Sequence, residues 1–123
     1  LRLSLPRSRL TFIATFALSL AGLALAGLAF TTDPTIRSTP ATWHGRLHDL
    51  SFVLLGLTLM PSMILLGFAF HKTDLWKGFA VYTWITAALA LPTFWLKGAA
   101  FYVFILAILI WSEVTAIHLN SKQ

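Results

Sequence analysis

Residues 50–70 read LSFVLLGLTLMPSMILLGFAF and contain no charged side chain. A helix rises about 1.5 Å per residue, so about twenty apolar residues cross about 30 Å of hydrocarbon. Similar runs cover residues 10–30, 76–96 and 99–119. They are continuously apolar and lack the short alternation that is typical of barrel strands. We therefore predict an all-α fold, an integral membrane four-helix up-down bundle that forms a single domain over residues 1–123.

The composition agrees with this fold class. Hydrophobic residues make up 58% of the chain, charged residues 11%, and the mean hydropathy is +0.81. These values leave too few polar residues to cover a soluble domain. The net charge of +5 lies at the ends of the apolar runs, where it suits anionic headgroups, so we expect a lipid bilayer as partner and no nucleic acid. The absence of cysteine excludes disulfides and thiolate ligands.

The distribution of Lys and Arg predicts an orientation. Residues 71–75 and 97–98 are short connections that force antiparallel neighbours, and residues 31–45 form the one long outer loop. With the amino terminus in the cytoplasm, six basic residues lie inside and three outside, which favours cytoplasmic termini. The inner set is Arg2, Arg7, Arg9, Lys72, Lys77 and Lys122, and the outer set is Arg37, Arg46 and Lys97.

The five tryptophans fit the same topology. Trp43 and Trp95 are expected near the outer interface and Trp76 near the inner one, where amphipathic rings prefer to lie. Trp84 and Trp111 fall deeper in their spans, so we expect them to pack between helices.

His44 and His48 are candidate metal ligands at the start of the second helix. Four residues apart, they share one helix face, a spacing at which two imidazoles can bind one metal ion. Asp49 lies about 100° around the helix from His48, so we expect it to have a structural or proton-linked role instead. The alternative for the histidines is that they anchor the helix by hydrogen bonds to loop carbonyls or headgroups.

His71 and His118 are candidate cofactor ligands on the inner side. Two imidazoles from different helices can hold a haem or a chlorin. Both residues lie at helix ends, however, so the alternative is that they are interfacial end residues.

Glu113 is the acidic residue placed within a span, seven residues before Asn120 and thus about 10 Å below the inner end. A charged carboxylate there is costly, so we expect it to be protonated, paired or facing a wet cleft. Lys77 is its expected cationic partner, with Tyr82, Thr83 or Ser112 as hydrogen-bonding alternatives. The role can be structural or proton-linked.

Residues 31–119 resemble the prokaryotic membrane family catalogued as domain of unknown function 998. The resemblance rests on Asp33-Pro34, on residues 42–48 (TWHGRLH), and on Gly98 followed by Trp111. It implies a prokaryotic cytoplasmic membrane protein with an outer site around His44 and His48. Members commonly have about six spans, so four would correspond to the carboxy-terminal part. The resemblance implies no reaction.

These observations favour a small non-catalytic membrane protein, an accessory or structural subunit that packs against other membrane subunits or against itself. Ala17/Ala21 and Gly22/Ala26 in the first span allow a close helix neighbour. The alternatives are a haem, pigment or metal-binding protein that uses the histidines, and a transporter-like protein with Glu113 in a cleft. We see no nucleophile–base pair in the sequence, so an enzyme is the less favoured class.

Overall fold

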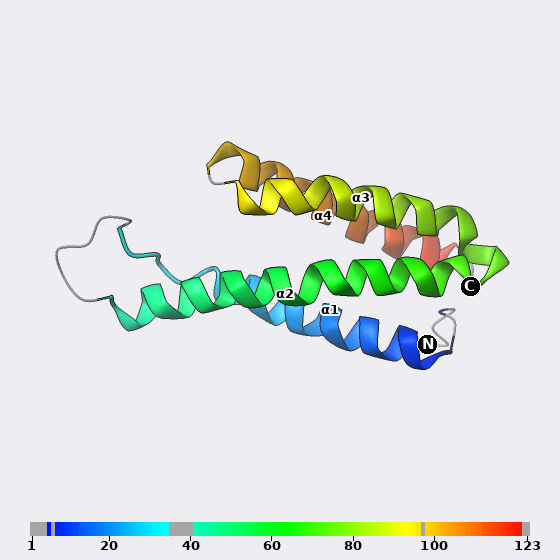
Figure 1. Cartoon of the computed structure of the whole chain (residues 1–123), viewed down its shortest axis with the longest axis horizontal. Helices are drawn as coiled ribbons and strands as arrows, with labels where there is room; N and C mark the ends of the chain where they lie inside the picture. Colours follow the sequence, from blue (N-terminus) through cyan, green and yellow to red (C-terminus); the bar gives the residue numbers. More distant parts are fainter. Residues whose placement is uncertain (1–4, 6, 35–40, 97, 122–123) are drawn as a thin grey trace.

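The computed structural model of the protein describes residues 5, 7–34, 41–96 and 98–121. Within these residues the fold is all-α, with four long helices, one 3-10 turn and no strand. In chain order the elements are α1 (Arg9–Gly27), α2 (Trp43–His71), η1 (Asp74–Trp76), α3 (Lys77–Trp95) and α4 (Ala99–Asn120). Successive long helices run in opposite directions (Figure 1), so the predicted up-down bundle is confirmed.

The bundle has two distinct ends (Figure 1). The start of α1, the end of α4 and the α2–α3 turn lie at one end, which we call the terminal end. The α1–α2 connection lies at the other, the loop end. All four helices are long and apolar enough to cross a bilayer, which indicates an integral membrane protein.

The helices cover the predicted apolar spans. α2 begins at Trp43, seven residues before its apolar run, in agreement with the expectation that this helix starts at Thr42 or Trp43, and it continues without interruption through Pro61 to His71. α1, in contrast, ends at Gly27 rather than at Phe30. The connection between α1 and α2 therefore covers residues 28–42 instead of the expected residues 31–45. Residues 35–40 lie outside the described part of the chain.

Local sequence explains where the helices start. The Ser8 hydroxyl accepts a hydrogen bond from the Thr11 amide at 3.1 Å and caps α1. Before α4, Gly98 adopts a φ of +74°, a conformation that side chains with a Cβ rarely tolerate. This glycine lets the chain turn sharply from α3 into α4.

Burial is uneven across the helices. In the most apolar eighteen-residue stretch of each helix, 44% of the residues are buried in α2, 22% in α1 and 11% in α4. Among the described residues, the backbone of α1 comes close only to that of α2, and the backbone of α4 only to that of α3, without close backbone contact between α1 and α4. The bundle is therefore open along one side, between its first and last helices.

Candidate functional site

The loop end is organised by Asp33, which caps α2 from a distance of nine residues. Its carboxylate accepts hydrogen bonds from the Thr42 amide at 3.0 Å and from the Thr42 hydroxyl at 2.7 Å. The same hydroxyl accepts a bond from the Gly45 amide at 3.1 Å. A Cβ at Gly45 would collide with the Asp33 carboxylate, so any other residue there would have to displace this side chain. A negative charge at a helix N-terminus is also favoured by the helix dipole.

His48 holds the end of α1 against the start of α2. Its Nδ1 lies 2.9 Å from the carbonyl oxygen of Phe30. This bond confirms, for His48, the alternative interpretation that the histidines anchor the loop. The His44 ring lies in a tilted contact with Trp43, with ring centroids 3.7 Å apart, and Trp43 in turn contacts Phe30 at 5.9 Å.

The described residues place no third ligand beside His44 and His48 that would complete a metal site. Among these residues, no group of three His, Cys, Asp or Glu side chains lies close enough to hold a metal ion. Asp49 is exposed one residue further along α2. The two histidines stay candidates as a pair on one helix face.

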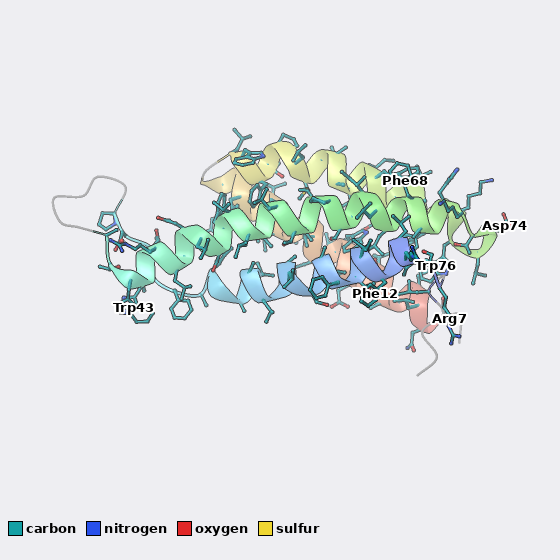
Figure 2. All side chains as sticks on the ribbon, turned by 60° about the horizontal axis from the view of Figure 1, so that its bottom comes forward. Arg7, Phe12, Trp43, Phe68, Asp74 and Trp76 are labelled. Atoms are coloured by element: carbon teal, nitrogen blue, oxygen red, sulfur yellow. The ribbon has the colours of Figure 1, made fainter. Side chains whose placement is uncertain are left out.

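The terminal end carries an aromatic cluster around His118, which we define as Phe70, Trp76, Phe79 and His118. The His118 ring lies 4.5 Å from Trp76 in a T-shaped contact and 5.1 Å from Phe79 in a stacked one. Trp76 also stacks on Phe70 at 4.8 Å. Trp76 was expected to be an interfacial ring, but it is only 1% exposed because η1 turns it under the helix ends. Figure 2 shows it at the opposite end from Trp43.

Two polar atoms in this cluster have no hydrogen-bond partner among the residues that the structure describes. They are the Nε1 of Trp76 and the Nε2 of His118, and both are buried. His71 belongs to a different contact, since its ring lies 5.7 Å from Trp84. The structure thus places the two candidate cofactor ligands at the same end but against different aromatic residues.

The deeper tryptophans pack between helices, as predicted. Trp111 is 2% exposed, and its Nε1 donates to the Thr83 hydroxyl at 3.1 Å. The indole of Trp84 fits against Gly67, where a Cβ would collide with it, and its Nε1 donates to the Ile64 carbonyl at 3.3 Å. Each indole joins two neighbouring helices.

Glu113 and Lys77 are not paired, which corrects the expected ion pair. Both side chains are exposed, and no ion pair joins these two described residues. The reason is rotational: Glu113 follows the buried Phe104 by nine residues, about two and a half helical turns, so it faces away from α3. The hydroxyl of Thr83 is likewise engaged with Trp111 and not with Glu113.

The opening between α1 and α4 forms an apolar groove of about 250 Å³. Leu18 and Gly22 of α1, Leu55 and Leu59 of α2, and Phe104 and Ile108 of α4 are among its lining residues. Ser112 also contributes, whereas Glu113 does not. A second groove, of about 270 Å³, lies between α2 and α3 beside Pro61 and is again lined without Glu113.

Sequence reasoning missed the role of Asp33 as a cap. The signal was the sequence of Asp33, Thr42 and Gly45, an acid followed by a helix-capping residue with a glycine three positions later. No family model, no curated protein and no solved structure matches this chain.

Proposed function

We propose that this protein is a small non-catalytic membrane subunit that packs through its outermost helices against a larger membrane complex or against a copy of itself. The sparse burial of α1 and α4 supports this role, because both helices carry large side chains that the rest of the chain leaves uncovered. Phe12, Leu23 and Tyr102, for example, are 72%, 71% and 75% exposed.

One observation carries the proposal: the position of Glu113. This carboxylate lies about 10 Å below the end of α4 and is exposed on the side that faces away from the bundle. It has no ion pair or hydrogen bond to any described residue. A carboxylate facing lipid tails is costly, and intramembrane acids commonly face a protein partner or a wet cavity. A neighbouring helix that donates to Glu113 removes this cost.

The mass of the purified particle tests the proposal. In a mild detergent or in lipid nanodiscs, we expect a protein mass well above the 13.6 kDa of one chain. Glu113→Gln is expected to weaken the association, whereas Asp74→Asn, at an exposed acid of the α2–α3 turn, serves as the matched control. A particle that contains one chain and nothing else under all gentle conditions overturns the proposal.

We further propose that the protein resides in a prokaryotic cytoplasmic membrane with both termini in the cytoplasm. The excess of basic residues on the terminal side supports this orientation. The chain has no cysteine, so single cysteines report their own side of the membrane. In intact cells an impermeant maleimide is expected to label Thr32→Cys but to label Ser121→Cys only after lysis. The reverse pattern overturns the orientation.

Membership of the family catalogued as domain of unknown function 998 is part of the same proposal. It is supported by the contacts among Asp33, Thr42 and Gly45, which gather residues that carry the resemblance into one cap. Proteins found to be related to this chain are expected to keep an acid, a hydroxyl and a glycine at these positions. Relatives that vary them independently contradict the assignment.

A further inference from the structure

The last turns of α4 are attached to the bundle by few side chains. Among the described residues, the fully buried side chains of α4 lie at or before position 111. Residues 112–120, which form about two and a half turns, include no fully buried side chain. Their contacts with the buried core come from Leu119 and from the half-buried His118, whose ring meets Trp76 of η1 and Phe79 of α3. The aromatic cluster around His118 therefore holds the end of α4 in place.

The aromatic cluster around His118 contains no acceptor for an N–H group of the His118 ring. The Nε2 of His118 is buried and makes no hydrogen bond to any described residue. The other buried polar atom of the cluster without a partner is the Nε1 of Trp76, an indole nitrogen that can donate but cannot accept. Phe70 and Phe79 carry no polar side-chain atom. A proton on the Nε2 of His118 would therefore be buried without a partner in the cluster.

The charge of His118 decides whether the Nε2 must carry a proton. A neutral imidazole can keep its single proton on Nδ1, whereas a charged imidazole has an N–H group at both nitrogens. Burial of a charged N–H group without an acceptor is more costly than burial of an unbonded neutral nitrogen. The stacked ring of Phe79 attracts a cation through its face, but this attraction recovers only part of the hydration that a buried charge loses. The cluster therefore favours the neutral ring.

The titratable and charged groups near this end do not change that balance. Within the described part of the chain, none of them forms an ion pair or a hydrogen bond with the His118 ring, and all except the half-buried Tyr82 are exposed. Cations outnumber acids among them, so they add no net attraction for a further positive charge. They are Arg7 and Arg9 at the start of α1, His71 and Lys72 at the end of α2, Asp74 in η1, Lys77 and Tyr82 in α3, and Glu113 in α4.

We propose that His118 makes the docking of residues 112–120 dependent on pH: the neutral imidazole holds the end of α4 in the aromatic cluster, and protonation releases it. The released state binds one proton more than the docked state, so docking weakens as the pH falls. After release the ring stays in the last turn of α4, where the helix dipole favours a cation. Trp111 keeps the preceding part of α4 on α3 through its hydrogen bond to Thr83, so release is confined to the end of the helix. This property belongs to the single chain and goes beyond the proposed function.

Hydrogen exchange of the full chain in lipid nanodiscs tests the pH dependence. Protection is expressed relative to the exchange of an unstructured chain at the same pH, at about pH 8 and about pH 5, the range in which imidazoles change charge. We expect the protection of residues 112–120 to be at least about fivefold lower at the acidic pH, and that of residues 83–95 in α3 to be unchanged. Equal protection of residues 112–120 at the two pH values overturns the proposal. Higher protection at the acidic pH also overturns it and shows that the attraction between the charged ring and Phe79 prevails.

Substitutions that fix the charge at position 118 assign the effect to His118. His118→Phe keeps an aromatic ring that cannot be protonated, so we expect it to show at both pH values the protection that the parent shows at the higher one. His118→Lys is charged at both pH values, and we expect low protection throughout. His71→Gln removes another histidine of the same end and should keep the pH dependence of the parent. A pH dependence that persists in His118→Phe, or one that is lost in His71→Gln, contradicts the role of His118.

The mobility of a spin label gives a second readout that is independent of exchange chemistry, and the chain has no cysteine of its own to interfere. Ile117 is 66% exposed and adjoins His118, so a label on Ile117→Cys is expected to become more mobile at the acidic pH. Leu106 is 58% exposed and precedes Trp111, so a label on Leu106→Cys is the control and should not change. Equal changes at both positions indicate that the whole helix loosens and overturn the proposed local release. Because both readouts follow the chain itself, a particle of one chain alone overturns the proposed function and leaves this test intact.

Discussion

The indole of Trp111 donates a hydrogen bond of 3.1 Å to the hydroxyl of Thr83, and both side chains are buried between α4 and α3. The Thr83 hydroxyl in turn donates a hydrogen bond of 3.0 Å to the carbonyl of Phe79, so the pair extends the backbone hydrogen bonding of one helix to its neighbour. α4 has few other buried side chains. This bond therefore fixes both the rotation and the height of α4 on α3.

Thr83→Val is expected to lower the free energy of unfolding by about 1 kcal/mol, because it leaves the Trp111 Nε1 buried without an acceptor. Thr86→Val is the matched control, since the Thr86 hydroxyl bonds only within its own helix, to Tyr82. Unfolding by SDS in mixed micelles measures the difference. Equal losses in the two variants would show that the interhelical bond contributes nothing.

Trp76→Phe and Trp111→Phe remove the same atoms from two fully buried sites, with 1% and 2% exposure. Of the two, Trp111 alone loses a hydrogen bond to a described residue, since the Nε1 of Trp76 has no partner within the described part of the chain. We expect Trp111→Phe to cost about 1 kcal/mol more than Trp76→Phe. Thermal unfolding in one detergent measures both. An equal or larger cost at Trp76 contradicts the expectation and indicates a water bound to its Nε1.

Asp33→Ala is expected to loosen the first turn of α2, because the Thr42 amide and hydroxyl lose their acceptor. Loss of a capping interaction of about 1 kcal/mol corresponds to about fivefold faster amide exchange at residues 42–45. Asp74→Ala removes an exposed acid at the other end of the bundle and is the control. Hydrogen exchange followed by mass spectrometry reads both variants, and unchanged protection in Asp33→Ala would disprove the cap.

Gly67→Ala is expected to destabilise the α2–α3 contact by about 1–3 kcal/mol, since the new methyl group meets the indole of Trp84. Gly78→Ala, where a Cβ meets nothing within 4 Å, should be neutral or slightly stabilising. The midpoint of thermal unfolding reports the change. A Gly67→Ala protein as stable as the parent would mean that Trp84 moves freely.

The sequence was sufficient for the fold class because the length of each apolar run is set by the thickness of a bilayer. The start of α2 at Trp43 could also be predicted, since Pro40 and Thr42 precede it. The rotation of each helix could not, because all four helices are apolar on every side and no polar stripe marks an outer face. The sequence therefore predicts Lys77 as the partner of Glu113, although the helices turn the two side chains apart.

The candidate sites were harder to predict from the sequence than the fold, for a related reason. The capping role of Asp33 depends on how the loop returns to α2, across nine residues that local patterns do not describe. Trp76 was assigned to the interface from its place near a span end, whereas a single 3-10 turn carries it inward. The hydrogen bond of His48 was easier to predict, since a histidine at the start of a helix beside a loop has a loop carbonyl within reach.

Each close helix pair in the described chain joins neighbours in sequence: α1 with α2, α2 with α3, and α3 with α4. Assembly of the described helices therefore does not require close backbone contact between the last helix and the first. Each new span can dock on the one made just before it as it leaves the translocation machinery, and contacts between sequence neighbours form early at little entropic cost. A chain halted after Trp95 would already possess the α1–α2 and α2–α3 pairs.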